Sequence, residues 1–339
     1  MGWNIKRVLI TGGAGFIGSN LSEALLREKM ELVIVDNFNN YYDPHYKEEN
    51  LKEIEYIAKK YGTQLFVCRG DICDTGFLNQ VFALYQPELV VHLAAYAGVQ
   101  PSIENPALYM KVNVDGTIHI LEAMRRYNIH RYIFASSSSV YGNNESVPFR
   151  ETDNVDAPIS PYAASKKSGE LINYTYHKLY NINTACLRFF TVYGKRQRPD
   201  LAIYKFTKKI FEGEEICLFG EGQTKRDYTY IDDTIQGIIK AMAWVDSKES
   251  RYEIFNLGES NVITLSQMVK TIEQCTDKKA KIKYLPEQPG DVVLTYADIT
   301  KAKQILGYFP STGFEEGISK FVQWFKSHRM GQPVNADGR

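Results

Sequence analysis

A glycine-rich turn between a short apolar run and an amphipathic segment constrains this chain more than any other feature. Residues 6–11 are apolar and β-branched, which predicts a strand, and residues 16–27 carry a helical pattern. Gly12, Gly15 and Gly18 have the spacing G-x-x-G-x-x-G. In such a unit the first glycine permits a tight turn, the second lets the backbone approach a pyrophosphate, and the third lets helix and strand pack closely. The unit therefore predicts a dinucleotide site.

An acidic residue after the second apolar run indicates which dinucleotide is bound. Residues 31–36 predict a strand that ends at Asp36, 18 residues after Gly18. A carboxylate there can accept hydrogen bonds from both ribose hydroxyls, and it repels the 2′-phosphate of NADP. Asp71 and Ile72 follow the third predicted strand, where a side chain can reach the adenine amine. We therefore expect NAD as the cofactor.

Strand and helix patterns alternate through the first half of the chain. Further apolar runs occupy residues 64–68, 89–93 and 131–135. Continuous apolar strands that alternate with helices are typical of a parallel sheet covered on both faces. The predicted fold class is α/β, with a doubly wound parallel-sheet Rossmann domain and a smaller α/β substrate domain. The predicted boundaries are 1–187 for the NAD-binding domain, 188–329 for the substrate-binding domain with some chain crossover, and 330–339 for a flexible tail.

Charge and cysteine content bear on partners and compartment. Lys plus Arg and Asp plus Glu number 40 each, so the basic excess typical of nucleic-acid binding is absent, and no nucleic-acid partner is expected. The five cysteines form no CxxC pair and follow no signal peptide, which favours reduced thiols in the cytoplasm. No apolar stretch approaches the ~20 residues that cross a bilayer, so no membrane partner is expected. The histidines show no metal-ligand spacing, and we interpret His92, inside an apolar run, as structural.

A tyrosine and a lysine four residues apart carry the predicted chemistry. Ser160 and Pro161 are typical of a helix N-cap followed by proline, so Tyr162 and Lys166 share one helix face. A phenol titrates near ~10, but a neighbouring cation together with the nicotinamide charge favours the phenolate. The pair can then remove a hydroxyl proton from an alcohol while a hydride leaves its carbon. Ser137 follows the fifth predicted strand, at the edge where doubly wound sheets bind ligands.

Motifs spread along the chain match those of one known family. They are TGGAGFIG at 11–18, Asp71-Ile72, Leu93-Ala94-Ala95, NVDGT at 113–117, SSSSVYG at 136–142, YAASK at 162–166 and RFF at 188–190. From residue 6 to about residue 326 the chain resembles the extended short-chain dehydrogenase/reductase family, in its nucleotide-sugar epimerase/dehydratase branch. The resemblance implies that the family's Ser/Thr–Tyr–Lys triad is Ser137, Tyr162 and Lys166.

The resemblance also implies oxidation of a nucleotide sugar at C4, and two serines narrow the chemistry that comes after this step. The 4,6-dehydratases carry an Asp-Glu pair directly before Val-Tyr-Gly, and uronate decarboxylases carry Glu there, whereas this chain has Ser138 and Ser139. A 4-epimerase needs no extra acid or base, because the 4-keto sugar turns in the pocket and receives the hydride on its other face. The segments that are similar to the UDP-glucuronate 4-epimerase subgroup are residues 195–202, Asn105-Pro106, 256–260 and 288–292. The hydroxyls of Ser138, Ser139 and Thr191 could hold a C6 carboxylate through neutral hydrogen bonds.

Further contacts are implied by the resemblance. Arg226 is expected to bind the UDP pyrophosphate, for which bidentate arginine geometry is suited. Gln288 stands where galactose enzymes have arginine, and Lys205 or Arg198 could compensate for it. Cys217 and Phe219 are expected beside uracil, and Asp291 at the uridine ribose. The residues expected to contact NAD are Gly12, Gly15, Phe16, Ile17, Gly18, Asp36, Asn37, Asp71, Ile72, Leu93, Ala94, Ala95, Tyr162 and Lys166.

These observations together predict an NAD-dependent 4-epimerase that interconverts UDP-glucuronate and UDP-galacturonate, with NAD tightly bound and no metal. The resemblance implies a homodimer through helices near residues 105–127 and 161–180. Three alternatives stay open: the same chemistry on UDP-glucose or UDP-N-acetylglucosamine, a UDP-uronate decarboxylase, and a non-catalytic NAD-binding sensor.

Overall fold

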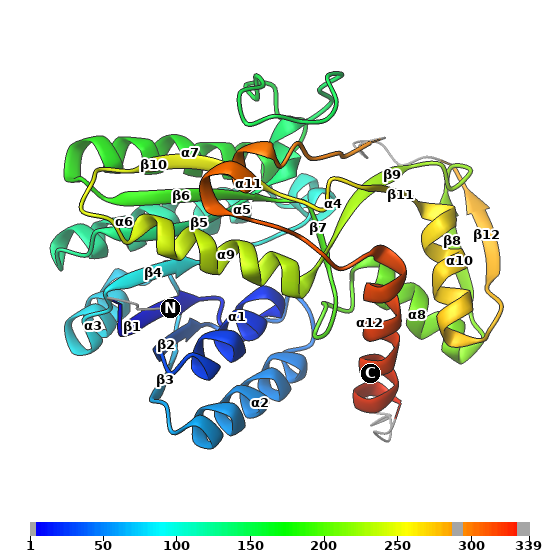
Figure 1. Cartoon of the computed structure of the whole chain (residues 1–339), viewed down its shortest axis with the longest axis horizontal. Coiled ribbons are helices and arrows are strands. Elements are labelled where there is room, and N and C mark those ends of the chain that lie inside the picture. The colour runs from blue at the N-terminus through cyan, green and yellow to red at the C-terminus, as the bar shows by residue number, and fades with distance from the viewer. Residues whose placement is uncertain (1–4, 287–293, 331–339) are drawn as a thin grey trace.

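The computed structural model describes residues 5–286 and 294–330, and a seven-stranded sheet dominates it (Figure 1). The strand order is β10-β6-β5-β4-β1-β2-β3, and every pairing is parallel. The strands are β1 (Arg7–Thr11), β2 (Glu31–Asp36), β3 (Leu65–Arg69), β4 (Leu89–His92), β5 (Arg131–Ser137), β6 (Asn183–Phe189) and β10 (Tyr252–Leu257). The predicted Rossmann fold is confirmed, and the five strands predicted from apolar runs begin and end within two residues of their observed bounds.

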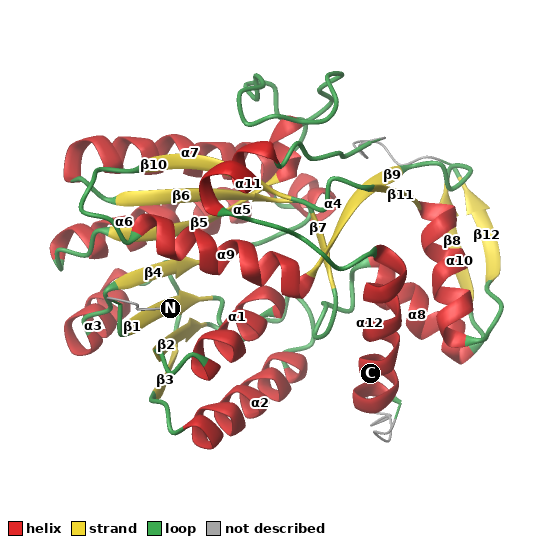
Figure 2. Ribbon diagram, in the orientation of Figure 1, coloured by secondary structure: helices red, strands yellow, loops and turns green. Residues whose placement is uncertain are grey.

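Helices cover both faces of this sheet (Figure 2). Val8 and Ile10 belong to one apolar core, which α1 and α9 share, whereas Leu9 belongs to a second core with residues of α3 and α6. Because alternate residues of each strand are buried on opposite faces, the strands read as continuous apolar runs. The helices around the sheet are α1 (Phe16–Arg27), α2 (His45–Tyr61), α3 (Thr75–Tyr85), α4 (Val99–Glu104), α5 (Pro106–Met110), α6 (Gly116–Arg126), α7 (Pro161–Tyr180), α9 (Ile231–Val245) and α11 (Thr300–Leu306). A π-helical turn (Lys111–Asp115) joins α5 to α6, and a 3₁₀ turn (Ser138–Tyr141) follows β5.

A smaller region of short strands and three helices stands at the carboxyl edge of the sheet (Figure 1). Its strands form a three-stranded sheet, β7 (Thr191–Tyr193), β9 (Lys225–Tyr230) and β11 (Val262–Thr264), and a parallel pair, β8 (Glu215–Phe219) and β12 (Lys281–Leu285). Its helices are α8 (Ala202–Glu212), α10 (Leu265–Thr276) and α12 (Phe314–Arg329). The chain does not stay in this region after residue 188, because β10 pairs with β6 in the large sheet and α9 packs on α1.

The helices and cysteines of the described part of the chain bear on two further predictions. No helix within residues 5–286 and 294–330 has the length and apolar character needed to cross a membrane. All five cysteines are free thiols. Burial raises the pKa of Cys186 to about 12, which leaves this thiol protonated and unreactive.

Candidate active site

A cavity of about 480 Å³ opens at the carboxyl ends of β1, β2, β4 and β5. This edge is where doubly wound sheets bind ligands, because the loops of successive strands diverge there. Every residue predicted to contact NAD lines the cavity. Among the predicted substrate contacts, the residues that line it are Ser137, Thr191, Arg198 and Arg226.

The glycine-rich turn forms one wall of this cavity with no room for side chains. Gly12 has φ +69°, and a Cβ there would lie 2.9 Å from the backbone nitrogen of Ala94. A Cβ on Gly18 would lie 2.2 Å from the carbonyl oxygen of Gly12. Helix α1 begins directly after the turn, at Phe16, so its first N–H groups face the cavity side. This cradle fits the pyrophosphate of a dinucleotide, since a helix N-terminus supplies free donors to an anion.

Asp36 lies at the end of β2, buried in the cavity wall. Its Oδ1 accepts hydrogen bonds from the Phe38 backbone at 2.9 Å and from Lys47 Nζ at 3.1 Å, and its Oδ2 accepts one from the Ala14 backbone at 3.2 Å. A carboxylate oxygen can accept more than one bond, so Asp36 retains capacity for ribose hydroxyls. The residues of the turn and of this strand end therefore fit NAD.

Asp71 and Asn37 form a second polar pair in the same wall. Asn37 Nδ2 donates to Asp71 Oδ2 at 2.8 Å, and the Cys73 backbone donates to Asp71 Oδ1 at 2.8 Å. Burial raises the pKa of Asp71, but these hydrogen bonds outweigh it and hold the pKa below its usual value. The side chain is thus a carboxylate at neutral pH, able to accept a hydrogen bond from an amine.

The three catalytic candidates meet at the sheet edge. Ser160 caps α7 by accepting the Ala163 N–H at 3.1 Å, which sets where the helix begins and brings Tyr162 and Lys166 into the cavity. Ser137 ends β5, and its hydroxyl lies close enough to the Tyr162 phenol to act on the pKa of that phenol. Lys166 Nζ donates to the Ala135 carbonyl at 2.8 Å and lies 6.0 Å from the centre of the Tyr162 ring.

Burial and the charge of Arg198 set the electrostatics of this group. Burial raises the pKa of Tyr162, while the Ser137 hydroxyl and the Arg198 charge act in the opposite direction. Burial also lowers the pKa of Lys166 to about 7, because the ammonium has lost its water. The protein's side chains alone therefore keep Tyr162 protonated. Among them Arg198 is a cation whose charge favours the phenolate, and the effect expected of Lys166 together with a bound nicotinamide stays a prediction.

Four other predicted substrate contacts, Ser138, Ser139, Cys217 and Phe219, are not among the residues that line the cavity. Ser138 and Ser139 belong to the 3₁₀ turn after β5, and Ser139 Oγ donates to Ser137 Oγ at 2.9 Å. Cys217 and Phe219 are on β8, where they pair with β12, and are not among the residues that line the cavity. Asp291 lies outside the described residues.

Several lining residues were missed by sequence reasoning. Lys47 on α2 reaches Asp36, and Tyr41 forms a hydrogen bond from its hydroxyl to the Ala97 carbonyl at 2.6 Å. Arg198 stacks on the Tyr41 ring at 5.1 Å and pairs with Asp200 at 2.6 Å. No local motif marks Lys47 or Tyr41, since they reach the site through the tertiary packing of the segment after β2. Within the described ranges, no cluster of three or more His, Cys, Asp or Glu side chains is arranged to hold a metal ion.

Known proteins are similar to this chain over almost its whole length. The model of the GDP-mannose 4,6-dehydratase family matches residues 9–321. The chain is 42% identical over 321 residues to a UDP-glucuronate 4-epimerase from Thermodesulfobacterium geofontis, a match that covers 94% of this chain and 96% of the relative. A crystal structure of UDP-glucuronic acid 4-epimerase from Bacillus cereus, in complex with UDP-glucuronic acid and NAD, is similar with a TM-score of 0.86 and 33% identity, covering 95% of this chain and 99% of that one. UDP-glucose 4-epimerase from Thermotoga maritima, with UDP-glucose, is similar with a TM-score of 0.85 and 33% identity over the same shares.

Proposed function

Because the chain belongs to the extended short-chain dehydrogenase/reductase family, in the nucleotide-sugar branch that the GDP-mannose 4,6-dehydratase model describes, we propose that it is an NAD-dependent UDP-sugar 4-epimerase. Its substrates are UDP-glucuronate and UDP-galacturonate, which it interconverts through a transient 4-keto sugar. The similarity to UDP-glucuronate 4-epimerases supports this reading. The similarity to UDP-glucose 4-epimerase makes UDP-glucose the second candidate.

One observation carries the choice of epimerisation within this branch. Among the described residues that line the cavity, the carboxylates are Asp36 and Asp71, and both stand at the ends of β2 and β3 with the predicted adenosine contacts. No lining carboxylate accompanies the three catalytic candidates, which are Ser137, Tyr162 and Lys166. Removal of water from the sugar needs an additional acid and base, whereas epimerisation at C4 needs only one group that takes and returns the hydroxyl proton.

The triad supplies the proton chemistry. Tyr162 takes the proton of the sugar 4-hydroxyl, and Ser137 holds that hydroxyl by a hydrogen bond. Lys166 binds the nicotinamide ribose, and its charge, with that of Arg198, stabilises the phenolate. A bound NAD would supply the acceptor for the hydride from C4 and the source of its return. After the sugar has turned, Tyr162 gives the proton back to the 4-oxygen. The protonation state of Tyr162 is therefore the same at the start and at the end of each cycle.

The substrate contacts follow from the cavity wall. We assign Arg198 and Arg226 to the pyrophosphate and Thr191 to the C6 carboxylate, because all three line the cavity. Ser138 and Ser139 remain the proposed further carboxylate contacts, although Ser139 donates to Ser137 in the structure. Cys217 and Phe219 remain proposals for uracil, and Asp291 for the uridine ribose.

Proton NMR of the purified protein tests the function directly. UDP-glucuronate and, separately, UDP-glucose are incubated with the protein without added NAD. We expect a new anomeric signal of the galacto-epimer from the uronate alone, because NAD that is restored in each cycle stays bound through purification. Turnover of UDP-glucose in place of UDP-glucuronate would show that the substrate carries a neutral hexose. A pentose product would contradict the proposal and indicate a decarboxylase.

Assembly and location complete the proposal. We place the enzyme in the cytoplasm, which the free state of all five cysteines supports. We also propose a homodimer through α6 and α7. Leu171 and Leu179 on α7 are 58% and 66% exposed, as apolar side chains at a subunit interface would be in a separated chain.

A further inference from the structure

The loop between β7 and α8 carries residues of the active-site cavity, and its conformation is strained. Gln197, Arg198 and Leu201 all line the cavity. Arg196, beside them, has φ +63°, a left-handed conformation that a side-chain-bearing residue adopts only when its surroundings enforce it. Arg196 is nevertheless 6% exposed, so its charge is held inside the protein. Burying the arginine charge and holding the strained backbone both cost free energy, so Arg196 needs a partner whose interaction offsets them.

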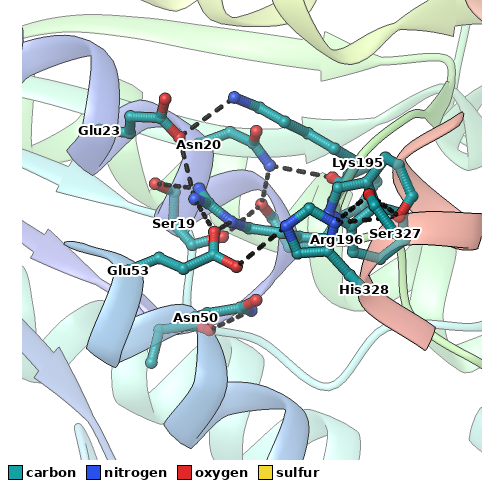
Figure 3. A network of polar contacts seen from close by, with 12 residues as sticks. Ser19, Asn20, Glu23, Asn50, Glu53, Lys195, Arg196, Ser327 and His328 are labelled. Carbon is teal, nitrogen blue, oxygen red and sulfur yellow. Dashed lines mark hydrogen bonds and ion pairs between the residues drawn. The ribbon is translucent and has the colours of Figure 1, made fainter. Parts of the chain in front are cut away.

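Arg196 lies in a polar network between α1 and α2 (Figure 3) and is not among the residues that line the cavity. Its guanidinium donates to Glu53, at 2.9 Å from Nε, and forms an ion pair with Glu23 at 2.9 Å. It also donates to the carbonyl oxygen of Ser19 at 3.2 Å. The planar guanidinium thus contacts two carboxylates and one backbone oxygen, an arrangement that a lysine cannot reproduce.

The helices on the other side of this network belong to the cofactor-binding half. Helix α1 begins at the glycine-rich turn, and Asn20 on it donates to the carbonyl oxygen of Lys195 at 3.2 Å. Burial raises the pKa of Glu23, but Arg196 and Lys195 outweigh it and lower the pKa to about 2. Glu23 is therefore ionised at physiological pH and keeps the charge that pairs with Arg196.

Arg198 has a different environment from Arg196. It lines the cavity, stacks on Tyr41 and pairs with Asp200. Only Gln197 separates the two arginines, so fixing Arg196 against α1 and α2 restricts where Arg198 can lie.

We propose that Arg196 is a positioning residue that fastens the β7–α8 loop to the cofactor-binding helices and thereby places Arg198 for the pyrophosphate of the substrate. The attachment of the loop through Arg196 thereby sets the distance between the substrate and the cofactor that α1 binds. This inference rests on the proposed function, because it takes Arg198 as a UDP contact.

Calorimetry with UDP as the probe tests the inference on the NAD-containing protein. We expect Arg196→Gln to weaken UDP binding roughly tenfold, the effect of a charge-assisted hydrogen bond that is lost through misplacement of Arg198. We expect the double variant Arg196→Gln/Arg198→Ala to bind UDP no more weakly than Arg198→Ala alone, since the first change acts through the second residue. Arg27→Gln is the matched control, because Arg27 also pairs with Glu23 but on the exposed surface of α1.

A purely structural role for Arg196 predicts a different pattern. The inference would be overturned if the effects of the two substitutions on UDP binding add in the double variant. It would also be overturned if the Arg196→Gln protein binds UDP as the wild type does. If Arg196→Gln fails to fold, Glu53→Gln weakens the same anchor with Arg196 retained, because it removes one of the two carboxylates that pair with Arg196. The double variant Glu53→Gln/Arg198→Ala is then expected to bind UDP no more weakly than Arg198→Ala alone. Failure of the wild type to bind UDP would overturn the proposed function and this inference together, which separates that outcome from the other two.

Discussion

Tyr162 shows how much of a site can be read from residue types and spacing. The four-residue step to Lys166, the Ser160 cap and the position of Ser137 after β5 predicted the grouping that lines the cavity. The direction of the Tyr162 pKa could not be predicted, because it depends on the depth of burial and on Arg198, which reaches the site from a distant loop.

Tyr162→Phe should lower turnover by roughly 10²–10⁴-fold, the usual effect of losing a general acid/base. Binding of UDP and retention of NAD should be unchanged, because the ring keeps its packing. Steady-state rates by NMR, with calorimetry for UDP, measure both. Tyr174→Phe, on the exposed side of the same helix, is the control. Full turnover by Tyr162→Phe would show that the proton transfer belongs to another group, and an inactive wild type that binds NAD would favour the sensor.

At the scale of elements, prediction succeeded where local sequence sets the structure. Continuous apolar runs defined β1 to β5, since burial on both faces allows no other pattern. The place of β10 could not be predicted, because its pairing with β6 joins segments 68 residues apart. The conformation of the β7–α8 loop could not be predicted for the same reason, because Glu23 and Glu53, the side chains that hold Arg196, lie on helices from the start of the chain.

Strand β4 carries a titratable group that should shape the acid stability of the fold. His92 Nδ1 lies 2.7 Å from Thr11 Oγ1 and its Nε2 lies 3.2 Å from Thr117 Oγ1. Burial, with the nearby Lys166 charge, lowers the pKa of His92 from 6.5 to about 3. Between these pH values the unfolded chain binds the proton and the folded chain does not. The contribution of His92 is therefore fully present above pH 6.5 and is lost as the pH falls toward 3.

His92→Gln should make the fall in stability between pH 6.5 and pH 3 shallower, because glutamine does not titrate. At pH 7 the free energy of unfolding should drop by about 1–3 kcal/mol from imperfect replacement of the hydrogen bonds. Urea unfolding at several pH values measures both effects, with His45→Gln on the exposed start of α2 as the control. An unchanged slope would show that His92 is not the group that titrates.

For the whole molecule, the proposed dimer makes a prediction about an exposed face. Leu171→Glu places a charge in the middle of the apolar face of α7, and burying that charge in a subunit interface costs more than the contact gains. Light scattering should then give a mass near the 38.8 kDa of one chain, where the wild type gives twice that mass. Leu84→Glu, on the exposed end of α3, should leave the mass unchanged. A monomeric wild type would contradict the dimer.

The path of the chain between its two regions has a mechanical consequence. The backbone leaves the large sheet after β6, returns for α9 and β10, leaves again for β11, and comes back for α11. Each crossing is a covalent link, so the two regions are joined by several chain segments rather than by one linker. A rotation of one region against the other must therefore change the backbone torsions of all these segments together, which restricts the motion more than a single linker would.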